Sequence, residues 1–465
     1  MMKMMTQSKT ESNLPLLVVV MMTSFLTTFT GSALNLSVPA ISEEFHAGAV
    51  SIGWIITGYI LASAALSVPF GRLADLYGKK KVLVAGQFFF TACAFLCSVA
   101  WNIETIIAFR LAQGIGAAMI FATNVAILVA SCPAEKRGKM LGLSVSATYA
   151  GLSLGPVIGG VMNHNFGWRS IFYITAALAA AAALLAVLRL KEPDSAASER
   201  KERMDLPGCI LYSSMLACIM YGFSSVTSGI LPKILLLIGV LLFFLFLRRE
   251  LHTPEPLIDL DLFRKNTIFS FSNIAALLNY GASYAVSYLL SIYLQTVLGF
   301  DSQIAGLILI TSPVFQTILS PAAGRLSDRY SPFVLTSCGM AISAAGIFAF
   351  VFIREGYPLP LIIGALTVIG IGFAFFSSPN TNAIMSSVEK KDYSIASSVT
   401  ATSRSIGHTL SMAVVTTVVA VTIGNITLAE ASAVAVLHAM RISFIIFTVF
   451  CIAGIFFSAK RKNRE

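Results

Sequence analysis

Long runs of hydrophobic residues dominate the chain, and short polar segments separate them. Each run is continuous over about 20 residues, the length that an α-helix needs to cross the hydrocarbon core of a bilayer. Strands of a membrane barrel would instead alternate apolar and polar residues over about 10 positions. The pattern therefore predicts an all-α integral membrane protein. We count fourteen runs, with approximate bounds 15–37, 49–70, 82–101, 104–129, 138–162, 168–189, 207–226, 231–248, 267–296, 302–322, 332–353, 358–386, 394–423 and 436–458.

The spacing of the runs predicts six transmembrane helices, then two, then six. Two polar stretches, 191–205 and 249–265, isolate the middle pair. We therefore expect five regions: a cytoplasmic leader (1–14), an N-terminal six-helix bundle (15–190), linkers with two additional transmembrane helices (191–265), a C-terminal six-helix bundle (266–458) and a basic cytoplasmic tail (459–465).

Composition and charge agree with a membrane protein. Hydrophobic residues make up 56% of the chain and charged residues 12%, whereas soluble domains carry about 25% charged residues. The net charge of +10 would suggest nucleic acid as the partner of a soluble protein. Here most Lys and Arg residues fall in segments on one side of the spans, so the positive-inside rule explains them. We expect no nucleic-acid partner, a location in the plasma or inner membrane, contact with lipid, a monomer, and both termini in the cytoplasm.

Several chemistries lack a signature in this sequence. No G-x-x-x-x-G-K-[ST] phosphate loop is present, which argues against an ATP-driven pump. The seven cysteines have no metal-ligand spacing, and no nucleophile constellation is visible. We therefore predict no enzymatic activity, no cofactor and no metal site.

One charged segment, Gly71–Leu83 (GRLADLYGKKKVL), lies between two hydrophobic runs. The sequence PFGRLAD, at Pro69–Asp75, recurs as PAAGRLSD at Pro321–Asp328, and each copy follows the second run of a six-run block. Matching hairpins in two halves are typical of transporters built from repeats. Chance is the alternative for a single match of this kind.

These residues resemble signatures of the major facilitator superfamily, and within it the fourteen-span drug:proton antiporter group. The Gly71–Leu83 segment resembles the loop signature between spans two and three. Arg110–Ala118 (RLAQGIGAA) is similar to the fourth-span signature, and Gly151–Gly160 (GLSLGPVIGG) to the fifth-span signature of antiporters. Tyr293–Gly299 and Pro379–Ser386 resemble the second half of the group. The resemblance implies two six-helix bundles around a central cavity, plus two extra central spans.

The sequence departs from this group in span one. The group usually carries an acid five residues before the asparagine of an N-x-x-x-P ending. Asn35 and Pro39 match that ending, but Thr30 occupies the position of the acid. Without this acid, the chain lacks a residue on which the group's usual coupling to protons and cations depends.

We expect the charged hairpins to form a cytoplasmic gate. Gly71 and Gly78 permit tight turns and positive φ, and Asp75 can accept hydrogen bonds from the N-terminal amides of a neighbouring helix. A basic loop that only sets topology would explain the lysines, but not the placement of Gly and Asp. The predicted gate residues are Gly71, Arg72, Asp75, Gly78, Lys79, Lys80, Gly324, Arg325 and Asp328.

Glycines recur every fourth residue in the fifth run. Gly151, Gly155 and Gly159 would form one smooth helix face for close packing, Pro156 allows a bend, and Gly160 completes the antiporter-type motif. We expect helix packing here, and a rocking contact is the functional interpretation.

Four polar residues inside spans are candidates for coupling: Arg110, Gln113, Arg404 and His408. A cation in hydrocarbon is costly and usually faces a cavity or a partner, although Arg110 could instead snorkel to the outer interface. Arg404 and His408 share a helix face, and His408 could carry a proton or be a hydrogen-bonded core residue. No Asp or Glu lies in the middle of a predicted span, so the interior offers no carboxylate.

Further polar or aromatic residues within spans are candidates to line a cavity. They are Thr28, Thr30, Ser32, Asn35, Trp54, Asn124, Tyr280, Tyr284, Gln295 and Gln316.

The sequence favours a secondary active transporter that works by alternating access, takes a small-molecule substrate, and exports amphipathic organic compounds or drugs by coupling to protons. The alternative is an anionic-solute transporter or an uncoupled facilitator, because of Thr30 and the interior cations. A third hypothesis is a non-transporting membrane sensor or scaffold, against which the gate signatures argue. Fold alone does not decide among them.

Overall fold

The computed structural model describes residues 14–34, 37–46, 49–190, 204–224, 226, 229–253, 256–258, 260–300, 302–422 and 433–460. Residues 1–13 of the expected leader, Asn35, most of the 191–205 linker and residues 461–465 of the tail therefore lie outside the described residues. The described chain is helical throughout its long hydrophobic runs.

The N-terminal half consists of six long helices and two short ones. Polar or glycine breaks end them: Gly78 and Gly167 both have positive φ, and Asn102 caps the fourth long helix by accepting a hydrogen bond from the Thr105 amide. The elements are α2 (Leu14–Leu34), α3 (Val38–Phe45), α4 (Ala49–Tyr77), α5 (Lys79–Ser98), α6 (Ile103–Ser131), η1 (Ala134–Lys136), α7 (Arg137–Phe166) and α8 (Arg169–Arg189).

The C-terminal half repeats this layout with more interruptions. Its elements are α12 (Thr267–Ser283), α13 (Val286–Ile292), η2 (Tyr293–Val297), α14 (Ser302–Leu309), α15 (Thr311–Ser327), α16 (Pro332–Ala349), η3 (Phe350–Phe352), α17 (Leu359–Ser386), η4 (Lys390–Asp392), α18 (Tyr393–Thr422) and α19 (Ala433–Lys460).

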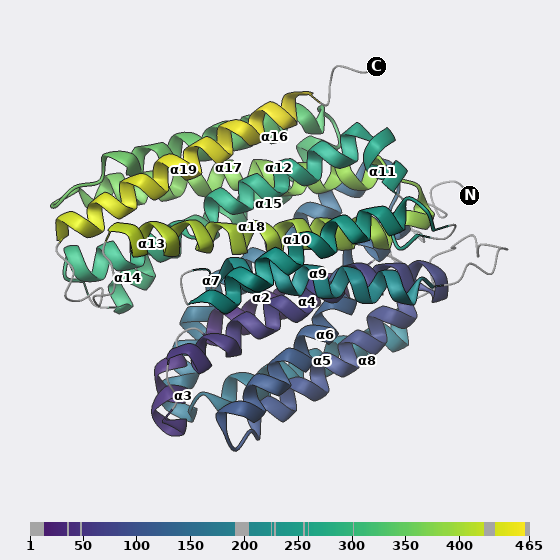
Figure 1. Ribbon diagram of the computed structural model, residues 1–465, viewed down its shortest axis with the longest axis horizontal. Coiled ribbons are helices and arrows are strands. Elements are labelled where there is room, and N and C mark those ends of the chain that lie inside the picture. The colour runs from purple at the N-terminus through teal and green to yellow at the C-terminus, as the bar shows by residue number, and fades with distance from the viewer. Residues whose placement is uncertain are drawn as a thin grey trace.

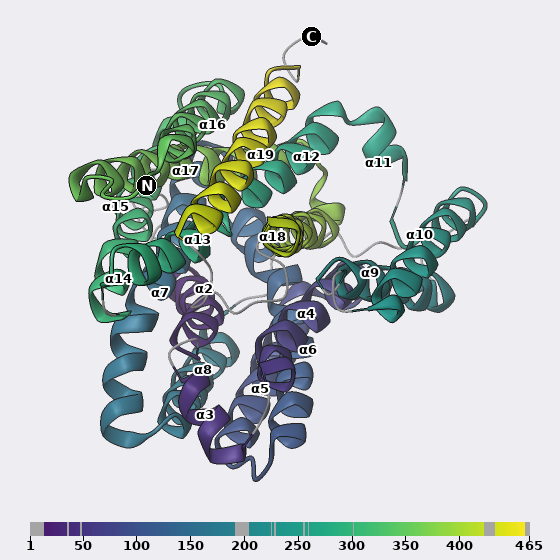
Figure 2. The same cartoon turned by 60° about the vertical axis from the view of Figure 1, so that its left-hand side comes forward.

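A helix pair lies between the halves in the sequence: α9 (Leu206–Ser224) and α10 (Ile230–Glu250), followed by the short α11 (Leu260–Lys265). Figure 2 shows this pair beside α4 and α18. Tyr212 of α9 donates a hydrogen bond to Thr402 of α18, and Ser213 donates to the Ala65 carbonyl of α4. Helix α9 therefore contacts both bundles along one side, and α10 packs on α9.

An ion pair joins the ends of α9 and α10. Arg249 lies 2.6 Å from Asp205, measured from Nη2 to Oδ1. Burial raises the pKa of Asp205. Hydrogen bonds from Arg249 and the Gly208 amide, together with the Arg249 charge, lower the pKa by more than burial raises it, so the net shift is downward. The carboxylate is therefore ionised wherever the hairpin is folded at neutral pH.

Twelve helices in the described part of the chain are long and apolar enough to cross a membrane. The expected count of fourteen is therefore not confirmed. The expected run 267–296 is broken after Ser283, so α12 alone is 17 residues long. The expected run 394–423 does form the 30-residue α18, but its many Ser and Thr residues lower its hydropathy.

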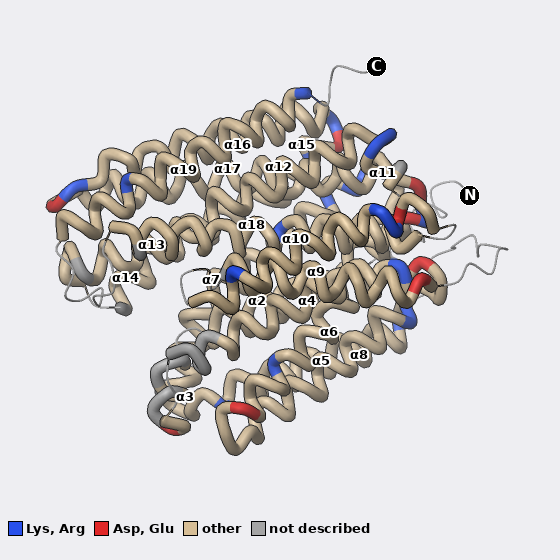
Figure 3. Tube along the Cα trace, viewed as in Figure 1, with Lys and Arg blue, Asp and Glu red and all other residues tan. Residues whose placement is uncertain are grey.

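The two bundles meet at one end and diverge at the other. Figure 1 shows them close together toward the end of the molecule where α11 lies, and separated toward α3 in one bundle and α14 in the other. We name these the closed end, which contains Asp75 and Asp328, and the open end, which contains α3 and α14. Charged residues gather at the closed end (Figure 3).

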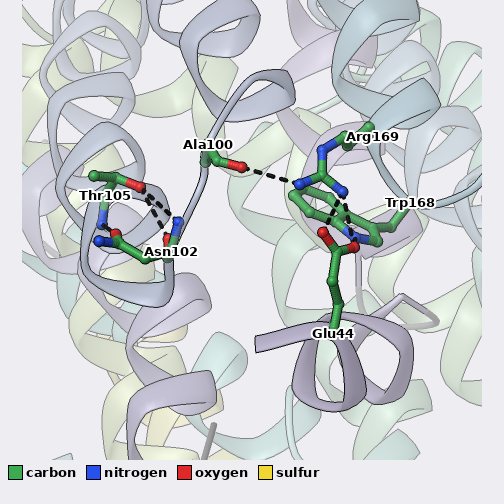
Figure 4. Close-up of polar contacts among 6 residues, drawn as sticks. All are labelled: Glu44, Ala100, Asn102, Thr105, Trp168 and Arg169. Atoms are coloured by element: carbon green, nitrogen blue, oxygen red, sulfur yellow. Dashed lines mark hydrogen bonds and ion pairs between the residues drawn. The ribbon is translucent and has the colours of Figure 1, made fainter. Parts of the chain in front are cut away.

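A polar cluster fixes α3 at the open end of the N-terminal bundle (Figure 4). Glu44 accepts hydrogen bonds from Trp168 Nε1 at 2.7 Å and from Arg169 at 2.8 Å, while Arg169 also donates to the Ala100 carbonyl. Burial raises the pKa of Glu44, but the hydrogen bonds from Trp168 and Arg169 lower the pKa by more than burial raises it. The net shift is downward, so the carboxylate stays ionised at neutral pH.

Candidate functional site

A polar cavity of about 100 Å³ lies between the two bundles. Three helices of each half contribute to its wall: α2, α6 and α7 on one side, and α12, α17 and α18 on the other. Its lining residues are Ser24, Thr27, Thr28, Phe121, Asn124, Val125, Leu141, Ser144, Val145, Thr148, Tyr149, Tyr280, Ser377, Thr381, Met385, Ser397, Thr400, Ala401 and Arg404.

Hydroxyl groups dominate the N-terminal wall of the cavity. Asn124 donates a hydrogen bond to the Ser24 hydroxyl at 2.9 Å, and that hydroxyl lies 3.1 Å from Ser144. Thr28 donates to the Thr148 carbonyl at 2.8 Å. These bonds hold α2, α6 and α7 together around a polar surface.

Among the described lining residues, the C-terminal wall adds one aromatic ring, Tyr280, and one cation, Arg404. Tyr280 packs edge-on against Phe373, which in turn packs against Tyr149. The guanidinium of Arg404 lies 5.3 Å from the centre of the Phe121 ring. Arg404 is the one charged side chain among the described lining residues, which include no Asp or Glu.

The closed end is sealed by two matching carboxylate contacts between the bundles. Asp75 of α4 accepts hydrogen bonds from the amides of Ser394 and Ile395, at 3.3 and 3.0 Å. Asp328, which follows α15, accepts from the amides of Gly138 and Lys139, at 2.6 and 2.9 Å. Each pair of amides belongs to the second and third residues of its helix, α18 or α7. We name these two contacts the amide latches.

Close glycine contacts accompany both latches, four residues before each aspartate. A Cβ on Gly71 would lie 2.3 Å from the Ser398 hydroxyl, and one on Gly324 would lie 2.2 Å from the Gly138 carbonyl. The expected turn at Gly71 is wrong, because α4 continues to Tyr77. Gly71 serves close helix approach, whereas Gly78 has the expected positive φ of 108°.

The gate cations have different surroundings. Lys79 is buried and pairs with Asp75 at 2.7 Å, so it supports the latch carboxylate from its own hairpin. Arg72 and Lys80 are half-buried, and Arg325 is exposed. The latch hydrogen bonds across the bundles are made by the two aspartates.

The glycine face of α7 packs against α2. A Cβ at Gly151, Gly155 or Gly159 would lie within 2.4–2.7 Å of Phe25, Ser32 or Ala33 atoms. Pro156 lies inside the helix, and Gly160 is half-buried. The sequence-based expectation of close packing on this face agrees with these distances, because no side chain fits between the helices.

Arg110 does not snorkel, and that alternative is wrong. Its side chain is fully buried, donates to the Ile55 carbonyl at 2.9 Å and to Gln113 Oε1 at 2.6 Å, and lies 4.3 Å from the Tyr59 ring centre. The side chain joins α6 to α4 inside one bundle. Neither Arg110 nor Gln113 lines the cavity between the bundles.

His408 lies beyond the cavity, although it shares a helix face with Arg404. Its ring stacks on Tyr284 with centroids 4.1 Å apart and meets Tyr280 edge-on at 5.5 Å. The cavity lining includes Tyr280 and Arg404 but not His408 or Tyr284.

The other cavity candidates divide into two groups. Thr28, Asn124 and Tyr280 line the cavity. Thr30 is buried within its bundle and donates to the Leu26 carbonyl, while Ser32 donates to the Leu152 carbonyl. The remaining candidates lie away from the lining: Trp54 stacks on Tyr221, Gln295 is exposed, and Gln316 is buried and donates to Ser312.

Sequence reasoning missed most of the hydroxyl and aromatic lining, including Ser24, Ser144, Tyr149 and Ser377. Single Ser and Thr residues are common in helices, so none of them is conspicuous alone. A usable signal was the Ser- and Thr-rich start of α18, where Ser397, Thr400 or Ala401, and Arg404 follow helical spacing and all reach the cavity.

Comparison with known proteins agrees with this architecture. The sequence matches the Major Facilitator Superfamily over residues 20–412 and again over 272–465. It is 31% identical to the riboflavin transporter RibZ of Clostridioides difficile over 85% of this chain and 86% of that protein. It is 28% identical to the multidrug resistance protein Stp of Mycobacterium tuberculosis, covering 83% of this chain and 72% of Stp.

Among solved structures, the proton:xylose symporter XylE superposes with a TM-score of 0.70 at 13% identity, over 97% of this chain and 96% of XylE. The fold is therefore that of multi-pass membrane transporters. The chain belongs to the Major Facilitator Superfamily, whose members carry small molecules, often with ion coupling, and are not enzymes.

Proposed function

We propose that this protein is a secondary active transporter that works by alternating access and exports amphipathic organic compounds by coupling to protons. The observation that carries the proposal is the pair of amide latches at one end of a polar inter-bundle cavity. Helices that meet through a few hydrogen bonds at one end, and diverge at the other, can exchange these two arrangements.

Relatives and local structure support export without defining the solute. One relative is named a multidrug resistance protein and another a riboflavin transporter, so hydrophobic drugs and riboflavin are both solutes to test. The glycine face of α7 packs on α2 within the N-terminal bundle, while Gly138 and Gly142 of the same helix closely approach α15 of the other bundle, a contact on which the bundles can rock.

A second candidate is an anionic-solute transporter or an uncoupled facilitator. Thr30 replaces the acid of the antiporter group, and the described cavity lining has Arg404 but no carboxylate. Arg110, Gln113 and His408 are the further candidates for coupling. A non-transporting sensor would have no need of both latches, so we place it third.

We also infer that the chain crosses the cell membrane fourteen times and that both termini lie in the cytoplasm. We infer further that the protein is a monomer. Helices α12 and α13 together would form one of the two crossings beyond the twelve, and α18 would form the other. Both lie among the bundle helices, and α18 faces the cavity, which accounts for its polar sequence. The gathering of charge at the closed end supports a cytoplasmic closed end.

A disulfide across the closed end tests alternating access. A Cβ on Gly71 would lie 3.1 Å from Ser398 Cβ, close to the roughly 3.5–4.5 Å of a disulfide. In a cysteine-free background, the Gly71→Cys/Ser398→Cys double variant should stop transport on oxidation and recover it on reduction. The two single variants should not respond to the oxidant.

Transport itself is measured in proteoliposomes with an imposed pH gradient, using riboflavin, a lipophilic cation and an organic anion side by side. We expect the unaltered protein to transport a solute that the oxidised double variant does not transport. Continued transport after complete cross-linking would contradict alternating access, and transport of no probe under any gradient would contradict the proposed function.

A further inference from the structure

The inter-bundle cavity presents one cation and no compensating acid. The guanidinium of Arg404 reaches the cavity from α18, three helical turns into the bundle interface. None of the ion pairs formed by the described residues includes Arg404, and its guanidinium lies over the Phe121 ring. A guanidinium in such an environment stabilises negative charge and repels positive charge.

The hydroxyls around Arg404 mostly present acceptor oxygens to the cavity. Thr381 donates its proton to the Ser377 carbonyl, Thr400 to Ala396, and Ser397 to Phe121. Each hydroxyl hydrogen is therefore used by backbone, and the lone pairs of the oxygen remain for a solute. Groups that donate hydrogen bonds, such as hydroxyl or amino groups, complement this surface.

Three aromatic residues, Phe121, Tyr149 and Tyr280, also line the cavity. Tyr149, Tyr280 and Phe373 form an edge-to-face series, with Phe121 under the guanidinium. Flat rings of a solute pack favourably against such walls.

Resting on the proposed transport function, we propose that Arg404 selects the substrate class: aromatic organic anions that also carry a hydroxyl or amino donor. The acidic oxygens bind the guanidinium, the ring packs on Tyr149 and Tyr280, and the donor meets the oxygens of Thr381 and Thr400. Lipophilic cations, the usual probes for multidrug export, are disfavoured by the same guanidinium.

The test compares two probes of nearly equal size and opposite charge, 4-hydroxybenzoate and 4-hydroxybenzylamine, binding to the full chain in lipid nanodiscs at neutral pH. Calorimetry should show the anion binding about tenfold or more tightly than the cation. Benzoate, which lacks the hydroxyl donor, should bind more weakly than 4-hydroxybenzoate.

Variants assign the charge preference to one residue. Arg404→Gln should weaken 4-hydroxybenzoate about tenfold or more, and Arg404→Lys should retain part of the affinity because it keeps the charge. Lys233→Gln removes an exposed cation of α10 and should leave binding unchanged. If Arg404→Gln does not fold, the comparison of probes on the unaltered protein and the Arg404→Lys variant still decide the outcome.

Transport of tetraphenylphosphonium in proteoliposomes separates this inference from the proposed function. If the cationic probe binds as tightly as the anion, or Arg404→Gln leaves anion binding unchanged, the substrate assignment is overturned. Movement of tetraphenylphosphonium in that case would leave the proposed transport function standing. If no probe binds or moves, both proposals fail.

Discussion

At the scale of single residues, the two latch aspartates make the same backbone contacts but have different neighbours. Asp75 also forms an ion pair with Lys79, and both side chains are more than nine-tenths buried. No cation among the described residues forms an ion pair with Asp328. Burial raises the pKa of Asp328 more than its two amide bonds lower it. Removing the charge should therefore have unequal effects at the two positions.

We expect Asp75→Asn to open the closed end more than Asp328→Asn. Replacing Asp328 removes charge-assisted hydrogen bonds worth about 1.5–3 kcal/mol. Replacing Asp75 also leaves Lys79 buried without its partner, for which the penalty is about 3–5 kcal/mol. The measurement is the rate at which an impermeant maleimide, added on the closed-end side, labels Ser144→Cys in the cavity.

The double variant Asp75→Asn/Lys79→Met supplies the control. Removing the orphaned ammonium should bring the labelling rate back toward that of Asp328→Asn. Equal rates for the two single variants would show that Lys79 contributes nothing to closure.

We expect Asp392 to make the closed end sensitive to pH. Burial is the main cause that raises its pKa from 3.8 to about 6; the charges of Asp75 and Glu389 add to this, while Lys391 and Arg72 oppose it. Since the raised pKa belongs to the closed arrangement, closure takes up a proton between about pH 4 and pH 6. Closure is therefore favoured in acid and weakens as pH rises through 6.

The expected result is faster maleimide labelling of the cavity cysteine, after correction for reagent chemistry, at pH 7 than at pH 5. Asp392→Asn should remove most of this difference. Glu135→Gln, at an exposed carboxylate near the start of α7, is the control and should retain it. A pH response that survives in Asp392→Asn would place the titrating group elsewhere.

At the scale of elements, the contact of α7 with α2 leaves no room for a methyl group. We expect Gly155→Ala to destabilise the protein by about 1–3 kcal/mol, the usual range for overpacking, because its Cβ would lie 2.7 Å from Ser32 Cβ. Gly364→Ala, in α17, has no atom within 4 Å of the new Cβ and should be neutral. Thermal unfolding in detergent compares them, and equal midpoints would contradict the packing argument.

Hydrophobic periodicity predicted most of the helices because a bilayer demands long apolar runs. It could not predict the break after Ser283, since the residues on both sides remain apolar. It also placed a loop at Gly71, where the helix continues to Tyr77 and a single residue, Gly78, separates α4 from α5. A charged segment therefore does not mark the end of a helix when tertiary contacts keep that segment helical, as they do at the end of α4.

The candidate site was only partly predictable for a different reason. Asp75 was identified together with the kind of group that it binds, because a carboxylate in a hairpin between two helices can accept hydrogen bonds from the N-terminal amides of a neighbouring helix. Its partner, the start of α18, has no side-chain signature, since backbone amides make the contact. Arg404 was singled out as an interior cation, but only the three-dimensional arrangement shows that it faces a cavity while Arg110 does not.

At the scale of the whole molecule, the internal repeat becomes a functional symmetry. The segment that recurs at 69–75 and 321–328 ends each time in an aspartate that binds the first turn of a helix in the other bundle. Each half thus holds the other by the same means. Of the added pair, α9 contacts both α4 and α18 on one side of the molecule, and α10 packs on α9, so the symmetry stops at the bundles.

The amide latches also determine how this end of the protein can vary. Every residue except proline supplies a backbone amide, so the latch hydrogen bonds themselves place no demand on the side chain at the receiving positions. Packing does place one: a Cβ on Gly138 would lie 2.6 Å from Asp328 Oδ1, and Ser394 and Ile395 are buried. Lys139 is half-buried, so we expect sequence variation at this receiving residue, whereas each latch needs its carboxylate.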